Sequence, residues 1–226
     1  RALAAGDLVS VDFGAIVDGW HGDSAISFSV GEARPDDQRL SDVTRESMWR
    51  GIAAARLGGR VGDISAAVQG FVQSRRERYG IIREFTGHGI GSQMHQAPDV
   101  PNHGKRGRGP LLVQGMCLAI EPMLTLGGDS TVTLDDDWTV ATRDRSRAAH
   151  WENTVAITRN GLWVLTAEDG GEAELQPYRA QVVLASRLGG LAAPADGVSI
   201  ALDDAGLERS VDFLLASPRL GVDGWC

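Results

Sequence analysis

The stretch Phe85-Thr-Gly-His-Gly-Ile-Gly-Ser-Gln-Met-His95 sets two imidazoles, His88 and His95, around a glycine-rich connection. Imidazole serves both as a metal ligand and as a hydrogen-bond donor to developing charge, so two of them in one short loop indicate a site of chemistry. The interspersed glycines allow the backbone to come close to whatever the imidazoles hold. A turn that carries two incidental histidines is the alternative, and this stretch alone does not exclude it.

Composition places the chain among globular proteins. Its 226 residues, 42% of them hydrophobic, can bury a sizeable core in one large domain or two small ones. A formal net charge of −8 argues against a general binder of DNA or of anionic membranes, since such proteins carry a basic footprint. Two cysteines form no disulfide framework and suit a reducing cytoplasm. No apolar run approaches the roughly 18 residues that span a bilayer.

The N-terminal part predicts a β-hairpin that carries two acids. Residues 8–17 alternate as a strand, the Asp-Gly pair at 18–19 is a hairpin turn signal, and a second strand follows over about 20–30. Asp12 and Asp23 lie in the facing strands, so the hairpin can bring both carboxylates to one face. Carboxylates in apolar strands are costly unless they are paired, hydrogen-bonded or bound to a cation. Two solvent-facing aspartates on an edge hairpin are the alternative.

Two later strands each carry one acid. The apolar run over 111–123 reaches Glu121 just before a proline that cannot donate to a sheet, so it predicts a strand end that opens onto a site. The stretch 149–158 predicts another strand, with the lone acid Glu152.

The remaining segments indicate scaffold rather than chemistry. Periodic apolar positions predict helices over 36–58 and over 63–80, the second one capped by Asp63. The charged excursion over 127–147 is typical of an exposed hairpin tip. Residues 169–226 contain no chemical constellation, and we interpret them as an appended tail behind a domain over 1–168.

The candidate ligands form an oxygen-rich set. Four carboxylates and one imidazole are too hard a set for a thiolate-type structural zinc site, and they suit two divalent ions that share bridging carboxylates. Two such ions can lower the pKa of a shared water and clamp a hydrolytic transition state, so the set indicates a dinuclear hydrolase. Its members are Asp12, Asp23, His88, Glu121 and Glu152.

Successive motifs of the chain resemble those of type I methionine aminopeptidases. The resemblance extends from about residue 1 to 166 and keeps the order and spacing of the motifs. It implies an α+β pita-bread fold, in which helices flank an antiparallel sheet. The motifs are Val11-Asp-Phe13 with Gly19-Trp-His-Gly-Asp-Ser24, Gly87-His-Gly-Ile-Gly91 with His95, Ala119-Ile-Glu-Pro-Met123, and Trp151-Glu-Asn-Thr154.

The resemblance also implies a role for each ligand. Asp12 would bind one metal ion and His88 the other. Asp23 and Glu152 would bridge the two ions. Glu121 would be a ligand that also takes the proton of the attacking water.

Three further residues gain roles only through the resemblance. His95 would donate a hydrogen bond to the scissile carbonyl and stabilise the tetrahedral intermediate. Met94 and Trp138 would line the pocket for the methionine side chain, where thioether and aromatic surfaces pack well against sulfur. Without the resemblance, both would be interpreted as packing residues.

By the same resemblance, the complete protein would be a cytoplasmic monomer that removes the initiator methionine from nascent polypeptides. It would use two divalent ions of Co, Mn, Fe or Zn. The ribosome would be a transient partner, contacted through the arginines at 143, 145 and 147 or through the basic cluster 105–108. Neither DNA nor a membrane is an expected partner.

Departures from the family pattern define the alternatives. The family has a further stretch before the position of Arg1, which carries another catalytic histidine, so we expect a chain that is incomplete at its N-terminus and poorly active by itself. Gln96-Ala97 stands where acids are common, and Asn153 stands where histidine is frequent. An Xaa-Pro aminopeptidase or prolidase would use the same ligands, and an inactive remnant would keep them. Fold relatives that became binding proteins have lost ligands, whereas all five are present here.

Overall fold

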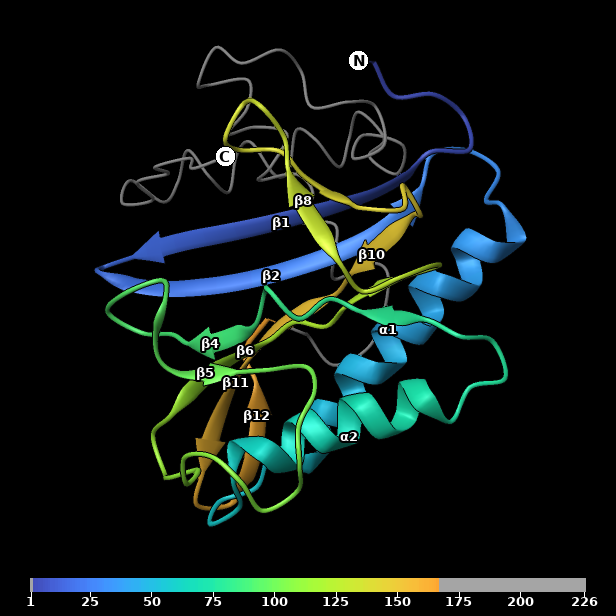
Figure 1. The fold of residues 1–226 in the computed structure, drawn as a ribbon. Helices are drawn as coiled ribbons and strands as arrows, with labels where there is room; N and C mark the ends of the chain where they lie inside the picture. The colour runs from blue at the N-terminus through green and yellow to red at the C-terminus, as the bar shows by residue number, and fades with distance from the viewer. Residues whose placement is uncertain (1, 167–226) are drawn as a thin grey trace.

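The computed structural model describes residues 2–166, and the tail predicted over 169–226 lies outside this range. Its first element is the predicted hairpin of β1 (Leu8–Val17) and β2 (Trp20–Ser29), which runs along one edge of the main sheet (Figure 1). Asp18 and Gly19 connect the strands with positive φ angles of 51° and 83°. Such a turn needs φ above zero at both positions, which the Asp-Gly pair tolerates.

The main sheet is antiparallel throughout and has seven strands in the described part. Its order is β1-β2-β11-β6-β4-β5, and β12 pairs with β11 beside this path. Strands from both ends of the domain sequence therefore lie next to each other at the centre. The strands after the hairpin are β4 (Gly87–Gly89), β5 (Gln96–Val100), β6 (Cys117–Ile120), β11 (Glu152–Thr158) and β12 (Gly161–Val164).

Two smaller sheets complete the strand inventory of the described residues. One has the order β10-β7-β3, and the other is the β8–β9 hairpin. The tip of that hairpin, residues 134–139, is exposed throughout, so the predicted exposed tip is confirmed. Their bounds are β3 (Gly80–Ile81), β7 (Met123–Thr125), β8 (Thr131–Thr133), β9 (Val140–Thr142) and β10 (Ala148–His150).

The predicted strand over 149–158 is wrong in one respect. It is divided at Trp151 into β10, which pairs with β7, and β11, which pairs with β2 and β6. The division occurs because the two halves belong to different sheets. Glu152 consequently begins a strand instead of lying inside one.

The two helices α1 (Pro35–Ala54) and α2 (Val61–Gln73) lie together on one side of the main sheet (Figure 1). The prediction of a cap at Asp63 is wrong, because α2 begins at Val61. Asp63 is the third residue of the helix, in its first turn, and its carboxylate accepts a hydrogen bond of 2.8 Å from the backbone N–H of Arg60, the N-cap residue. The helix also ends at Gln73 rather than near residue 80. Neither helix is long and apolar enough to cross a membrane.

The main apolar core lies between these helices and the centre of the sheet. Met48 and Ile64 from the helices pack with Leu118 and Ile120 of β6 and Val155 of β11, all of them 1% exposed or less. Burying such side chains stabilises the fold by about 1.5–3 kcal/mol each. Because Ile120 is fixed in this core, the next residue along the chain has a fixed position at the end of β6.

Candidate metal centre

The hairpin register puts the two aspartates on one face. Asp12 pairs with Ala25, and Gly14 pairs with Asp23, so the two acids are diagonal neighbours across β1 and β2. This confirms the predicted shared face. Asp23 is 8% exposed, whereas Asp12 is exposed to solvent. Thr154 of β11 holds Asp23 from behind: its hydroxyl donates to the Asp23 carbonyl at 2.8 Å and accepts from the Asp23 N–H at 3.1 Å.

The two glutamates come to the same face from neighbouring strands. Glu152 pairs with Ala25 on the side opposite Asp12, so Asp12, Ala25 and Glu152 form one row across three strands. Glu121 directly follows β6, and the Asn102 side chain donates to its backbone carbonyl at 3.0 Å. Glu121 is 7% exposed and Glu152 is 2% exposed. The sheet thus brings together acids that are distant in the sequence: Glu121 follows the end of β6, and Glu152 begins β11.

His88 completes this arrangement from β4. Its Nδ1 lies 3.0 Å from the carbonyl oxygen of Gly89. A carbonyl can only accept, so Nδ1 carries the proton and the lone pair of Nε2 faces the acids. Nε2 lies 3.4 Å from Glu121 Oε1 and 3.9 Å from Asp23 Oδ2. An imidazole held in this tautomer is ready to act as a metal ligand.

Of the three other predicted site residues, two lie beside the acids. The rings of His95 and His88 meet edge to face with centroids 4.3 Å apart, and His95 is exposed. The methyl group of Met94 lies over Gly14, the strand partner of Asp23: a Cβ on Gly14 would come within 2.4 Å of it. Trp138 lies on the tip of the β8–β9 hairpin and is 70% exposed, and its predicted pocket role stays a prediction.

In the metal-free protein, the ionised forms of Asp23 and Glu152 are unfavourable. Burial, followed by the negative charges of Asp12 and Glu121, raises the pKa of Asp23 to about 7. Burial and the neighbouring charge of Asp23 also raise the pKa of Glu152 well above its usual range. A bound cation would offset these negative charges and favour the ionised form of both carboxylates. The electrostatics therefore favour a cation among these side chains.

The sequence reasoning missed His150, the last residue of β10. Its side chain is 12% exposed, and its Nε2 lies 3.3 Å from Glu121 Oε2. The available signal was an imidazole two positions before Glu152. An unbroken strand would have put both side chains on one face, but the local pattern also fits a histidine at an ordinary sheet edge.

The donor set fits divalent metal ions. Two groups have their ligand atoms within 4.8 Å of one another, and Glu152 belongs to both. Oε1 of Glu152 and Nε2 of His150 are buried without a hydrogen bond, as expected of atoms that a cation would satisfy. The groups are Asp12, His150 and Glu152, and Asp23, His88 and Glu152.

Comparison with known proteins identifies the family. Residues 1–159 match metallopeptidase family M24. The chain belongs to this family. Family M24 membership implies a divalent metal, and the described acids and imidazoles supply candidate ligands for it.

Curated proteins similar to this chain include several named methionine aminopeptidases. "Methionine aminopeptidase 1" of Mycobacterium tuberculosis is 55% identical over 170 residues, which cover 74% of this chain and 64% of that protein. "Methionine aminopeptidase" of Clostridium acetobutylicum is 50% identical over 166 residues, which cover 74% and 66%. The chain thus spans about two thirds of the length of these relatives.

Solved structures confirm the pita-bread fold of family M24 for this chain. Methionine aminopeptidase from Thermotoga maritima aligns with a TM-score of 0.70 at 43% identity, covering 73% of this chain and 65% of that one. Prolidase from Pyrococcus furiosus aligns with a TM-score of 0.57 at 21% identity, covering 74% and 43%, and this likeness shows the fold alone. The α+β fold expected from the sequence resemblance is therefore confirmed.

Proposed function

We propose that this chain carries the catalytic centre of a methionine aminopeptidase, which removes the initiator methionine from nascent polypeptides in the cytoplasm. The observation that carries the proposal is the meeting of five side chains, four from β1, β2, β4 and β11 and one from the residue that follows β6, in a chain 55% identical over 170 residues to a protein named "Methionine aminopeptidase 1". We assign them to two divalent ions drawn from Co, Mn, Fe or Zn. The five are Asp12, Asp23, His88, Glu121 and Glu152.

The position of each side chain indicates which of the two ions it would bind. Glu152 would bridge the two ions, since it belongs to both ligand groups. Asp23, diagonal to Asp12 and near His88, would bridge as well. Asp12 would complete one ion position and His88 the other.

The reaction assigns the remaining roles. A pair of divalent ions, when bound, lowers the pKa of a shared water and polarises the scissile carbonyl. Glu121 accepts the proton of the attacking water and passes it to the leaving amine. His95 donates a hydrogen bond to the carbonyl oxygen as charge develops on it, a role suited to an exposed imidazole whose ring contacts His88. Met94 provides a soft apolar wall next to Gly14 for the substrate side chain.

A peptide assay tests this function. The chain is freed of metal, reloaded with Co²⁺ or Mn²⁺, and incubated with Met-Ala-Ser and Ala-Pro-Ser, with the free amino acid as readout. We expect slow, metal-dependent release of methionine, in keeping with the poor activity expected from the sequence, and no cleavage of Ala-Pro-Ser. Cleavage of Ala-Pro-Ser alone would favour the prolidase alternative. A metal-loaded chain that cleaves neither peptide would favour the inactive remnant.

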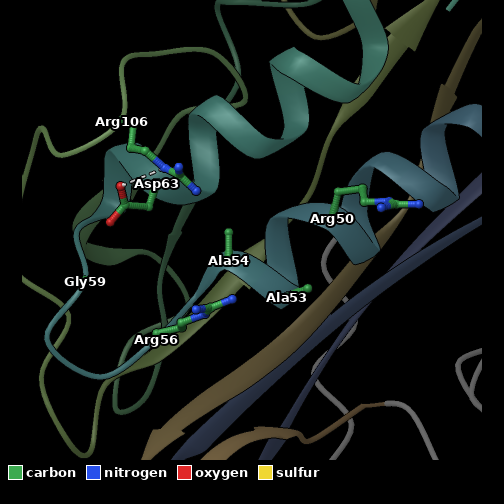
Figure 2. A pocket seen from close by; sticks show the side chains of 7 residues that line it. All are labelled: Arg50, Ala53, Ala54, Arg56, Gly59, Asp63 and Arg106. Carbon is green, nitrogen blue, oxygen red and sulfur yellow. Dashed lines mark ion pairs between the residues drawn. The ribbon is translucent and has the colours of Figure 1, made fainter. Parts of the chain in front are cut away.

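The ribosome is the partner that this function implies, and Arg106 offers a contact surface. Arg106 lines a hollow of about 330 Å³ between α1 and α2, together with Arg50 and Arg56 (Figure 2). Figure 2 shows Arg106 reaching Asp63, and the two groups are 4.0 Å apart at the surface. Arg147 is less suitable, because its guanidinium pairs with the buried Asp37.

Co-sedimentation with ribosomes tests this surface. We expect the Arg56→Glu/Arg106→Glu double variant to sediment with ribosomes less than the wild-type chain at low salt. The exposed Arg143 and Arg145 provide the comparison, as a second double variant with the same change in charge. Equal sedimentation of the wild type and both double variants would remove all four arginines from consideration.

A further inference from the structure

His150 has a backbone position that does not depend on its side chain. Its N–H donates to the hydroxyl of Ser27 at 2.9 Å, and its carbonyl accepts from the same hydroxyl at 2.8 Å. It also pairs with Met123 of β7. Two strands therefore fix the Cα of His150, and the imidazole extends from a fixed base toward the acids. A substitution of the ring leaves these backbone contacts in place.

The His150 imidazole mirrors the His88 imidazole across Glu121. Nε2 of His88 lies 3.4 Å from Oε1 of Glu121, and Nε2 of His150 lies 3.3 Å from Oε2. Each oxygen of one carboxylate thus faces one imidazole. His150 forms a ligand group with Asp12 and Glu152, just as His88 does with Asp23 and Glu152.

The geometry at His150 Nε2 is that of a ligand atom rather than of a hydrogen-bond donor. This nitrogen is buried and makes no hydrogen bond, although Glu121 Oε2 is within reach. A protonated Nε2 aimed at the carboxylate would make a charge-assisted bond. The ring also has a ligand nitrogen within 4.8 Å of carboxylate oxygens of Asp12 and Glu152, so a cation could be shared by the three residues.

We propose that His150 Nε2 is a metal ligand that completes the ion position of Asp12 and Glu152. This inference rests on the proposed dinuclear function and extends its ligand set. Each of the two positions then has one imidazole, one aspartate and a share of the glutamates. A nitrogen donor favours Co²⁺ and Zn²⁺ over Mn²⁺, so the Asp12 position should select those ions.

Cobalt binding, followed by proton NMR, tests the proposal on the 226-residue chain. An imidazole bound to Co²⁺ through one nitrogen shows a strongly shifted, exchangeable signal from the proton on its other nitrogen. We expect two such signals at two bound ions in the wild type, one in His150→Gln, and two in the control His95→Gln. The control removes an imidazole that contacts the His88 ring but belongs to neither ligand group.

Affinity provides the second measurement. Outer partners of ligands alone contribute about 10–100-fold to metal affinity, so loss of a ligand should weaken the second Co²⁺ by at least about 10-fold in His150→Gln. The first Co²⁺ should bind unchanged. Calorimetry and metal analysis give both values, and circular dichroism confirms that the variant is folded.

The outcomes separate this inference from the function on which it rests. A wild-type chain with two bound Co²⁺ ions but one shifted imidazole signal would overturn the role of His150 and leave the dinuclear centre intact. This result needs no variant to fold. A wild-type chain that binds fewer than two ions would overturn the dinuclear centre itself, and the role of His150 with it.

Discussion

Buried carboxylates occur in two regions of the described structure, and their negative charges are balanced in different ways. Asp37, near the start of α1, is 1% exposed and pairs with the guanidinium of Arg147. The acid cluster at the end of the main sheet, Asp23, Glu121 and Glu152, is almost as deeply buried. Within residues 2–166, no arginine or lysine makes an ion pair with these three acids.

The difference shows how a structural acid can be distinguished from a functional one. A guanidinium is permanently charged, so Asp37 is compensated by the chain itself and its region serves the fold. Among the described residues, the acid cluster has imidazoles and no guanidinium or ammonium group paired with it. Burial and the neighbouring negative charges raise the pKa values of Asp23 and Glu152. A chain that keeps such a cluster needs a cation from outside. The following predictions test this contrast, from the largest expected effect to the smallest.

The largest effect is expected at Arg147. Arg147→Met leaves Asp37 buried without its partner, which should lower the free energy of unfolding by about 3–5 kcal/mol. Urea denaturation measures this loss. The control is Arg143→Met, since Arg143 is exposed and its side chain donates only to a backbone carbonyl of Thr131. It should change stability by less than about 0.5 kcal/mol. Equal losses in the two variants would show that Asp37 is not compensated by Arg147.

Substitutions of Glu121 in the acid cluster and of the neighbouring His95 should have different effects on metal binding and turnover. Glu121→Gln should weaken metal retention and turnover together. His95→Ala should keep the metal and lower kcat by about 10²–10³, the usual effect of removing one transition-state donor. Metal analysis and peptide kinetics on the same preparations measure both quantities. Similar metal loss in the two variants would refute this division of roles.

The sequence predicted those features of the acid cluster that depend on residues close together in the chain. The Asp-Gly pair at 18–19 defined a turn, and two-residue turns fix the register, so Asp12 and Asp23 could be placed on one face without coordinates. Glu121 could be placed at a strand end because a proline follows it. These inferences depend on short-range stereochemistry, which a sequence displays directly.

The features that escaped prediction depend on distant partners. Nothing near Trp151 shows that β10 leaves the main sheet to pair with β7, and His150 could be connected with Glu121 only through that pairing. The ion pair between Asp37 and Arg147 likewise joins the first helix to the end of the excursion. Asp63 was misplaced for a local reason, because an acid three residues inside a helix and an acid at its cap look alike in sequence.

Neutralising a buried acid should stabilise the metal-free protein. The pKa of Asp23 is raised from 3.8 to about 7, so its stabilising contribution is complete below about pH 3.8 and is lost as the pH rises through 7. Asparagine cannot ionise and avoids this loss. In chelator-treated samples, Asp23→Asn should melt several degrees above the wild type at pH 8 and at a similar temperature at pH 4.

An exposed acid with the opposite pKa shift provides the control for this result. Hydrogen bonds from the Gly128 N–H and from Ser146 lower the pKa of Asp144 to about 2, so its contribution is present above its unfolded value of 3.8. Asp144→Asn should therefore melt slightly below the wild type at pH 8. If both asparagine variants shifted the melting temperature in the same direction, the contrast between the two kinds of acid would be wrong.

The smallest effect is expected from one methyl group at the rim of the acid cluster. In Gly14→Ala, the new Cβ would lie 2.4 Å from the methyl of Met94 and 3.7 Å from Oδ1 of Asp23. The second distance is an ordinary contact, whereas the first forces the flexible end of Met94 to move. We therefore expect metal binding and kcat to stay unchanged. The KM for Met-Ala-Ser should rise by about fivefold, which corresponds to about 1 kcal/mol.

The matched control is Gly22→Ala in the facing strand, where a Cβ would meet nothing within 4 Å. Its KM should equal that of the wild type, because Met94 keeps its place. If Gly14→Ala instead lost metal at an unchanged KM, the methyl group would act on Asp23, and Met94 would not be a wall of the substrate pocket. A rise in KM with full metal content would separate the two functions of this rim: the carboxylates hold the cations, and the thioether faces the substrate.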